Sequence, residues 1–241
     1  MSSSAALQEK SKLDGQMALF DHLDELRSRL VRSVLAILIC TVVATLFTTE
    51  IIKLLIEPYG IVLRTHGPTE GISTFFRVAF MTGFTIAVPF VFYQFLMFIL
   101  PGLERNEKKY IAISLPAASL LFLTGIGFAW FIMIPAAIGF LSTWQPEIFI
   151  QEWQSREYIP FVTSMIFWIG VSFETPLVIF IMAKVGLVTP QFLIKQWRFA
   201  VVLIAIAAAV ITPTVDPFNM GLVMLPLFVL YAISILLSYF A

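Results

Sequence analysis

Charged residues are scarce in this sequence. Only 12% of its 241 residues are Asp, Glu, Lys or Arg, whereas 59% are hydrophobic, and the mean hydropathy is +0.94. Soluble domains of this size do not have such a composition, and long apolar runs with few charges are typical of transmembrane helices. The formal net charge is zero, so the charge balance indicates no nucleic-acid partner. We therefore expect an all-α polytopic membrane protein.

Cysteine and histidine are almost absent. The single cysteine, Cys40, lies inside an apolar run, so the sequence predicts neither a disulfide framework nor a cysteine-based metal cluster. The two histidines, His22 and His66, are far apart in the sequence and have no ligand-like neighbours. We expect no metal and no cofactor.

Catalytic motifs are also missing. The sequence has no P-loop, no G-x-S-x-G and no H-E-x-x-H, and its serines and threonines are scattered. A membrane-embedded protease or transferase needs such a group of residues. We therefore do not expect an enzyme.

Apolar runs define the organisation of the chain. The polar, Ser-rich stretch 1–16 lacks the apolar core and cleavage site of a signal peptide, and we expect it to be a disordered tail. A single membrane domain, 17–241, is expected to follow it. A short surface helix is expected at 50–56. Six transmembrane helices are predicted at 31–47, 74–100, 110–140, 159–183, 197–211 and 218–240.

Basic residues are distributed unequally between the two ends of this six-helix arrangement. Four lie at one end, namely Lys53, Arg64, Arg77 and Arg156. The other eleven lie at the end that carries both termini: Lys10, Lys12, Arg27, Arg29, Arg32, Arg105, Lys108, Lys109, Lys184, Lys195 and Arg198. Cytoplasmic loops carry the excess of Lys and Arg, so both termini are predicted to be cytoplasmic.

Two features suggest an irregular bundle. The predicted helix at 197–211 is only about 22 Å long at 1.5 Å per residue, which is shorter than the ~30 Å hydrocarbon core. Prolines recur inside the predicted spans, and each tends to kink its helix. Kinked helices would form a concave bundle; alternatively, the prolines reflect only their general frequency in membrane helices. The prolines concerned are Pro89, Pro116, Pro135, Pro176 and Pro226.

Glu174 is the most notable polar residue within a predicted span. A carboxylate there costs ~2.5–3.5 kcal/mol on insertion scales and is a functional candidate by default. It can serve as the proton or cation site of a secondary transporter, although we find no internal repeat of the kind common in transporters. Alternatively, it has a packing role, either protonated or bonded to hydroxyls such as those of Ser172 or Thr175. Asp216, in the turn before the last span, can be an ordinary solvated residue.

The stretch leading into the first span carries acids followed by bases. Leu23, Leu26 and Leu30 share one helical face, and Glu25 and Arg29 lie at the spacing of a helical ion pair. On charge pattern alone, this is an amphipathic lead-in at the membrane surface. The acids here, and Glu104 or Glu107 in the loop after the second span, are either surface ion-pair partners or a paired site for a basic ligand.

These stretches resemble the TatC family, the receptor subunit of the twin-arginine protein translocase. The sequence HLDELRSRL at 22–30 resembles the family's H-L-x-E-L-R-x-R-L motif. Five further matches follow in the family's order: PFVFYQ and FILP at 89–101, LERNEKK at 103–109, FAWF with the later proline at 128–135, GVSFETP at 170–176, and TPTVD at 212–216. The matches together run from the stretch before the first predicted span to the turn before the sixth.

The sequence also departs from the family pattern. Asn106 replaces a frequent histidine, Trp130 a frequent tyrosine, and Met220 lies near a position that is often glutamine, for which Asn219 can substitute. The chain ends at Ala241 without the family's usual polar tail, so we expect that a tail has been removed.

The resemblance implies a non-enzymatic receptor in the cell inner (plasma) membrane, or in the thylakoid membrane of a cyanobacterium or plastid. It would bind the twin-arginine signal peptides of folded cargo, and assemble with TatA- and TatB-like single-span proteins and further TatC copies for proton-motive-force-dependent export. The implied polar contacts with partner helices are Glu174, Asp216 and Asn219. The implied signal-peptide site comprises Glu25, Arg27, Leu30, Glu107, Phe98 and Pro58, with Glu25 and Glu107 contacting the arginines.

Overall fold

The structure is a computed structural model that describes residues 2–56, 60, 63–99, 108–145, 147–148, 152–212 and 216–241. Helices dominate this part of the chain, and its only β-type pairing is an isolated bridge between Arg64 and Gln154. Pro58 and Glu107, both predicted site residues, lie outside the described residues. The helices are α1 (Ser2–Ile56), α2 (Glu70–Ile99), α3 (Lys108–Phe128), the π-helical turn η2 (Ala129–Met133), α4 (Ile134–Thr143), α5 (Ser155–Ser172), α6 (Thr175–Lys184), α7 (Pro190–Lys195), α8 (Trp197–Ile211) and α9 (Pro217–Ser238).

Five helical segments of the described chain are long and apolar enough to cross a membrane. They are His22–Ile56, Glu70–Phe98, Leu115–Thr143, Ser155–Lys184 and Pro217–Ser238. The remaining predicted span, 197–211, corresponds to α8, which is apolar but shorter. Large apolar side chains face outward along these helices, as Leu46 does at 79% exposure. Such an exterior suits a lipid environment and confirms the prediction of an all-helical, multi-pass membrane protein.

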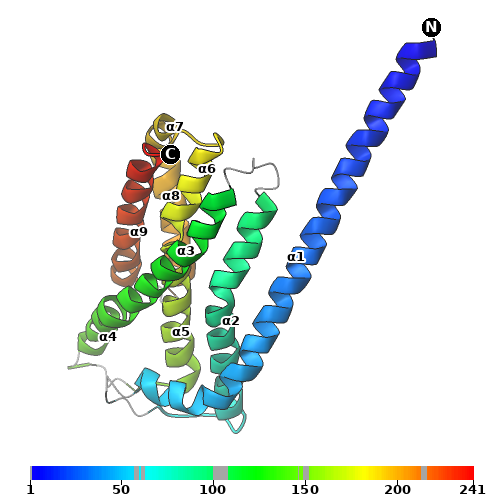
Figure 1. The fold of residues 1–241 in the computed structure, drawn as a ribbon. Coiled ribbons are helices and arrows are strands. Elements are labelled where there is room, and N and C mark those ends of the chain that lie inside the picture. The colour runs from blue at the N-terminus through cyan, green and yellow to red at the C-terminus, as the bar shows by residue number, and fades with distance from the viewer. Residues whose placement is uncertain are drawn as a thin grey trace.

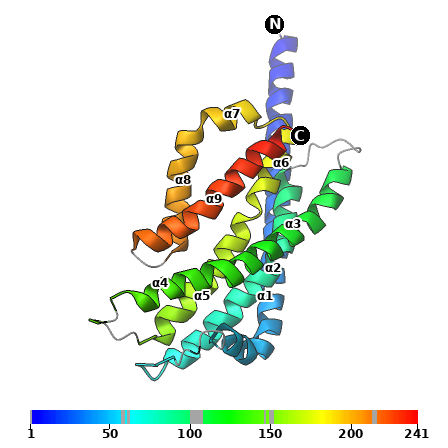
Figure 2. The same ribbon diagram turned by 90° about the vertical axis from the view of Figure 1, so that its left-hand side faces the viewer.

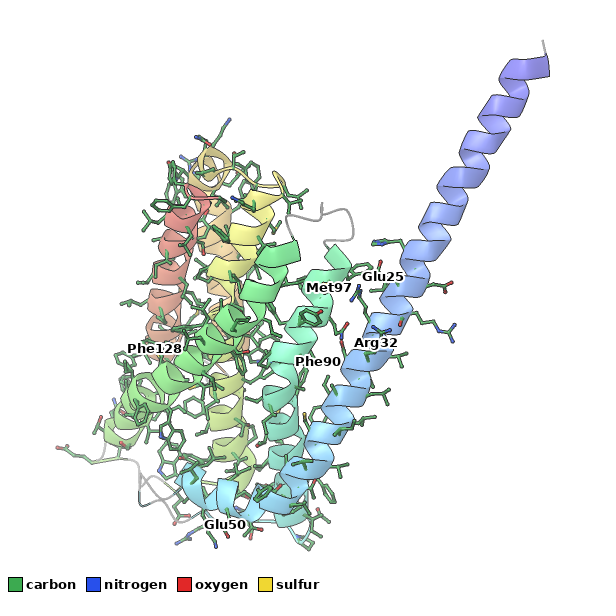
Figure 3. The ribbon with its side chains drawn as sticks, in the orientation of Figure 1. Glu25, Arg32, Glu50, Phe90, Met97 and Phe128 are labelled. Atoms are coloured by element: carbon green, nitrogen blue, oxygen red, sulfur yellow. The ribbon has the colours of Figure 1, made fainter. Side chains whose placement is uncertain are left out.

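Helix α1 is longer than the sequence predicts. It extends past the predicted span to Ile56, and its last turns, which include Glu50, run across the base of the bundle (Figure 3). These turns coincide with the expected surface helix at 50–56, which continues α1 instead of forming a separate element. At its other end α1 begins at Ser2, where a disordered tail is predicted, and extends beyond the other helices (Figure 1). The division into a tail, 1–16, and one domain, 17–241, stays a prediction.

Two of the predicted spans are interrupted next to a proline. The segment from Leu115 to Thr143 changes to the π-helical turn η2 immediately before Pro135. The segment from Ser155 to Lys184 breaks between Ser172 and Thr175, just before Pro176. Proline lacks an N–H and collides with the preceding turn, so it is tolerated best in the first turn of a new helix. Both prolines occupy such a position.

Packing divides the bundle into two groups of helices. On one side α1 packs along α2, and the Cβ of a residue at Gly83 would lie 2.4 Å from the Cα of Thr41. On the other side α9 packs against α6, α7 and α8 (Figure 2). Helices α3 and α5 lie between these groups, and the main core is built around buried residues of α5 such as Ile159 and Met165. The N- and C-termini lie toward the same end of the bundle (Figure 1).

Candidate functional site

A polar cluster joins α1 to α2 near the end of the bundle that carries the termini. Glu25 and Arg29 lie one helical turn apart, and Arg29 Nε donates a hydrogen bond of 2.9 Å to Glu25 Oε1. Arg29 Nη2 contacts the same oxygen, and Arg29 Nη1 donates to Gln94 Oε1 of α2 at 3.3 Å. The predicted pair of Glu25 and Arg29 is therefore present, and Gln94 holds it against α2.

The Glu25 carboxylate remains accessible within this cluster. Its side chain is 31% exposed, whereas that of Arg29 is 15% exposed. Figure 3 shows Glu25 on the stretch of α1 that lies beside the end of α2, close to Met97. A carboxylate has about four lone-pair positions, so Glu25 can accept a further cation while Arg29 stays in place. Arg29 thus orients the Glu25 carboxylate and leaves it accessible to a ligand.

Phe98 lies at the same end of the interface between α1 and α2. Its ring stacks on His22 with a centroid distance of 4.5 Å and an interplanar angle of 15°. The structure therefore brings together two predicted site residues, Glu25 and Phe98. Arg27 and Leu30 are exposed on α1, and Leu30 is 60% exposed. Neither has a side-chain hydrogen bond or ion pair with the described residues.

Glu174 lies at the break between α5 and α6. Its side chain is 3% exposed, and neither carboxylate oxygen has a hydrogen-bond partner among the described residues. The predicted alternative of a bond to Ser172 is wrong, because the Ser172 hydroxyl donates to the Trp168 carbonyl at 2.7 Å. A partner helix cannot reach Glu174 unless its neighbours in the bundle move.

Asp216 and Asn219 form a cap at the start of α9. Asp216 Oδ1 accepts a 2.7 Å hydrogen bond from the backbone N–H of Asn219, and Asp216 Oδ2 accepts one of 2.9 Å from Asn219 Nδ2. This is the usual N-cap arrangement, in which an acid satisfies a free N–H of the first turn. Asn219 is fully buried. Asp216 therefore has a structural role as an N-cap, and its contact with a partner stays a prediction.

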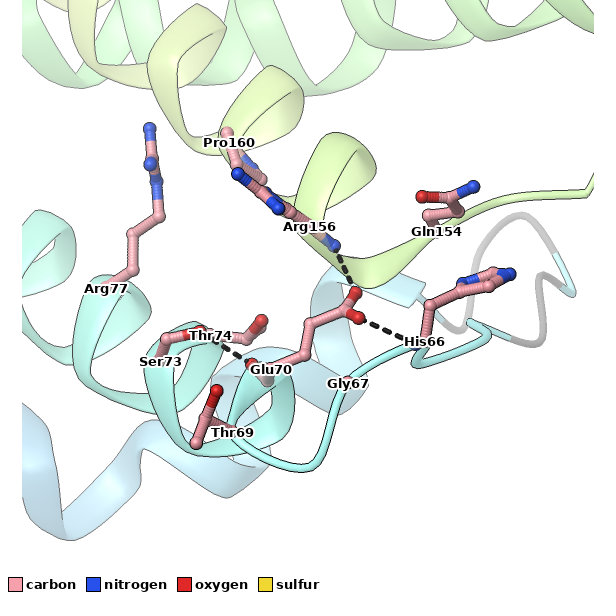
Figure 4. A pocket seen from close by; sticks show the side chains of 10 residues that line it. All are labelled: His66, Gly67, Thr69, Glu70, Ser73, Thr74, Arg77, Gln154, Arg156 and Pro160. Carbon is pink, nitrogen blue, oxygen red and sulfur yellow. Dashed lines mark hydrogen bonds between the residues drawn. The ribbon is translucent and has the colours of Figure 1, made fainter.

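The sequence did not point to Glu70, the first residue of α2. Its Oε1 accepts hydrogen bonds from Ser155 Oγ at 2.5 Å and from the Arg156 N–H at 2.9 Å, and its Oε2 accepts one from the His66 N–H at 2.7 Å (Figure 4). A nearby parallel bridge joins the same two segments: Arg64 N–H donates to the Trp153 carbonyl and Ser155 N–H to that of Arg64. Glu70 thus connects the starts of α2 and α5.

Gln94 was also missed as an individual site residue. An amide inside an apolar span is the same kind of signal that identified Glu174, and it could have been used here. Glu70 offers a weaker signal, because its sequence context indicates only the start of a helix. Within the part of the chain that the structure describes, no group of three or more His, Cys, Asp or Glu side chains could hold a metal ion.

Comparison with known proteins gives consistent matches over most of the chain. The family model "Sec-independent protein translocase protein (TatC)" matches residues 21–226. A Sec-independent protein translocase protein TatC from Deinococcus radiodurans is 36% identical over 91% of this chain and 85% of its own length. One from Synechocystis sp. is 33% identical over 87% and 83%. A crystal structure described as the twin arginine translocase receptor TatC has a TM-score of 0.82 and 33% identity, covering 91% of this chain and 98% of the other.

Proposed function

The chain belongs to the TatC family and is a non-enzymatic component of the Sec-independent protein translocase, in which we propose that it is the subunit that reads the paired arginines of signal peptides. One observation carries this proposal. Glu25 presents a partly exposed carboxylate beside the end of α2, and Arg29 and Gln94 hold it there. We assign the second acid of the site to Glu107, with Phe98, Leu30, Arg27 and Pro58 shaping the surface.

Carboxylates can explain why such a receptor requires arginine. A guanidinium is a planar fork that donates two parallel hydrogen bonds to one carboxylate, whereas an ammonium group is a point charge that cannot reproduce them. Arg29 already engages Glu25 Oε1, so a peptide arginine has Oε2 and the remaining lone pairs available. The receptor therefore distinguishes Arg-Arg from Lys-Lys by geometry rather than by net charge.

Direct binding tests this function. Wild-type protein in detergent is titrated with an Arg-Arg signal peptide and with a Lys-Lys peptide that is otherwise identical. The Arg-Arg peptide should bind about tenfold or more tightly than the Lys-Lys peptide, because only a guanidinium offers two parallel N–H donors in one plane to a carboxylate. Equal affinities for the two peptides would refute the proposed recognition.

We further propose that the protein spans the membrane six times, with α8 as the short fifth span and with both termini in the cytoplasm of a plasma-membrane protein. The eleven-to-four distribution of bases supports this orientation, and the two termini lie toward the same end of the bundle. Helix α8 has 15 residues, so the bilayer must thin locally or accommodate polar helix ends there.

Thiol labelling checks the orientation. Cys40 is first replaced by alanine, and a single cysteine is then placed at Glu147 or at Gln191, both of which are exposed. A membrane-impermeant reagent added from outside should label the cysteine at Glu147 and should reach the one at Gln191 only after the membrane is opened. The reverse pattern would place the termini outside the cell.

Glu174 is proposed to support assembly with TatA- and TatB-like single-span partners, with Asp216 and Asn219 contributing at the start of α9. This proposal is supported by the burial of the Glu174 carboxylate next to the helix break, where it has no hydrogen-bond partner among the described residues. Such a group gains free energy if a partner supplies a donor or shares a proton with it. The neighbouring helices must shift to expose it.

Two substitutions separate hydrogen bonding from charge at Glu174. Glu174→Gln keeps hydrogen bonding, whereas Glu174→Ala removes it, so the Gln variant should retain several-fold more partner crosslinking and export than the Ala variant. Glu157→Ala, which removes an exposed acid at the start of α5, serves as the control and should behave as wild type. Wild-type crosslinking in both Glu174 variants would contradict the role. Solute uptake by the protein alone, lost in both variants, would instead indicate a transporter.

A further inference from the structure

A polar pocket lies at the end of the bundle opposite the termini, between the starts of α2 and α5. Its volume is about 620 Å³. Four of its lining side chains carry nitrogen donors, and three carry hydroxyls: His66, Arg77, Gln154 and Arg156, and Thr69, Ser73 and Thr74. Figure 4 shows the guanidinium groups of Arg77 and Arg156 on the opposite side of the Glu70 carboxylate from His66. This surface is separate from the proposed signal-peptide site.

The acid in the pocket is already fully engaged. Glu70 accepts hydrogen bonds from Ser155, Arg156 and His66, all of which belong to the two segments that it joins. Its charge is thus directed toward the first turn of α5, where free N–H groups stabilise an anion. The carboxylate therefore organises the wall of the pocket, and an arriving ligand meets other groups.

The two arginines are the groups that remain available. Both are exposed, and neither guanidinium has an ion pair or a hydrogen bond with any described residue. By contrast, the nearby Arg64 pairs with Glu152 at 3.0 Å, and Lys53 pairs with Glu50 at 3.0 Å. Counting Glu70, the charged side chains that line the pocket carry one net positive charge. Guanidinium groups offer two parallel donors to a phosphate, so this pocket favours a phosphate group over a cation.

The position of the pocket along the membrane helices and its volume indicate which kind of phosphate it binds. The apolar spans Glu70–Phe98 and Ser155–Lys184 both begin at the pocket, which places it where hydrocarbon gives way to headgroups. At roughly 30 Å³ per water molecule, a pocket of about 620 Å³ has room for a phosphate that carries substituents. Long arginine side chains near the ends of membrane helices reach the interface, where the lipid phosphates lie.

We propose that this pocket binds the phosphate diester of a phospholipid headgroup, with Arg77 on α2 and Arg156 on α5 as its two ligands. A lipid bound in this way bridges α2 and α5. Glu70 already joins the starts of these two helices through hydrogen bonds. The site does not depend on signal-peptide recognition and is tested without any peptide.

The test measures lipid binding to the purified full chain in a sugar-headgroup detergent by native mass spectrometry, with phosphatidylglycerol as the probe. The double variant Arg77→Gln/Arg156→Gln should bind the lipid about tenfold or more weakly, because each substitution removes a charge-assisted hydrogen bond to the phosphate. Lys53→Gln removes an exposed base at the same end of the bundle outside the pocket and should change binding less than about twofold. The double variant Arg77→Lys/Arg156→Lys should bind with intermediate affinity.

Thermal unfolding verifies that the Gln variants stay folded, as expected for two side chains that have no polar partner among the described residues. Equal binding by wild type and the double Gln variant would overturn the proposal. So would diacylglycerol binding as tightly as phosphatidylglycerol, since it lacks the phosphate. If inorganic phosphate binds wild type as tightly as the lipid does, and loses affinity in the double Gln variant, the pocket takes free phosphate and the lipid assignment is wrong.

Discussion

Replacing Glu25 or Glu107 with alanine is expected to weaken binding of an Arg-Arg signal peptide by about tenfold or more, which corresponds to ~1.4 kcal/mol. The substitution removes the acceptor of a bidentate pair and leaves a peptide guanidinium without its partner. For Glu25 it also frees Arg29, which keeps its bond to Gln94 and then adds an uncompensated positive charge at the site. Titration of the purified variants with a labelled Arg-Arg peptide measures the loss.

The sequence supplies a matched control next to Glu25. Asp24 is an exposed acid in the same turn of α1 and forms no ion pair with the described residues, so Asp24→Ala should leave binding within about twofold of wild type. If Glu25 and Glu107 share one pair of arginines, the loss in the double alanine variant should be smaller than the sum of the single losses. Wild-type affinity in both single variants would mean that these carboxylates are only solvated ion-pair partners.

Replacing Gly83 with alanine is expected to disrupt the packing of α1 on α2. An added Cβ would lie 2.4 Å from Thr41 Cα and 2.5 Å from Thr41 N, and these are backbone atoms that cannot move aside without shifting the helix. Overpacking of this kind costs ~1–3 kcal/mol, and it opposes the intrinsic gain of alanine over glycine in a helix. The free energy or midpoint of thermal unfolding in detergent should fall accordingly.

A second helical glycine provides the comparison. A Cβ at Gly127 would meet nothing within 4 Å, so Gly127→Ala should be neutral or slightly stabilising. Adding Thr41→Ala to Gly83→Ala should not restore stability, because the closest contact is with the Thr41 backbone rather than its hydroxyl. Gly83→Ala should also weaken Arg-Arg peptide binding, since it separates Arg29 from Gln94. Unchanged stability would show that the two helices do not approach this closely.

Local patterns in the sequence predicted much of the fold. The apolar run at 197–211 coincides with α8. The ion pair of Glu25 with Arg29 follows directly from helical spacing. Such features depend on residues within one or two turns, and a single sequence contains that information. The assignment of Glu25 to peptide recognition came from resemblance to a family, because charge pattern alone favoured a solvated surface helix.

Contacts between distant segments could not be predicted in the same way. Gln94 bonds to Arg29 across 65 residues, and Glu70 bonds to Ser155 across 85. Neither pairing produces a repeating pattern of residues in the sequence, because each depends on how whole helices pack against one another. The burial of Glu174 was missed for the same reason: composition identified a costly carboxylate, but only the packing of neighbouring helices determines its exposure. At Pro135 the sequence predicts a kink but not the π-helical turn, Ala129–Met133, that precedes this proline in the structure.

The link between Glu70 and the start of α5 also constrains the order of assembly during biosynthesis. The Ser155 hydroxyl and the Arg156 N–H complete the hydrogen bonding of the Glu70 carboxylate. Glu70 is synthesised 85 residues before Ser155. The first three spans must therefore be synthesised, and the loop after them must reach the Glu70 side of the membrane, before this junction can close. Until then the Glu70 carboxylate has only local hydrogen bonds, such as the one from the His66 N–H. The start of α2 is thus among the first membrane segments to be made and among the last to reach its final hydrogen bonding.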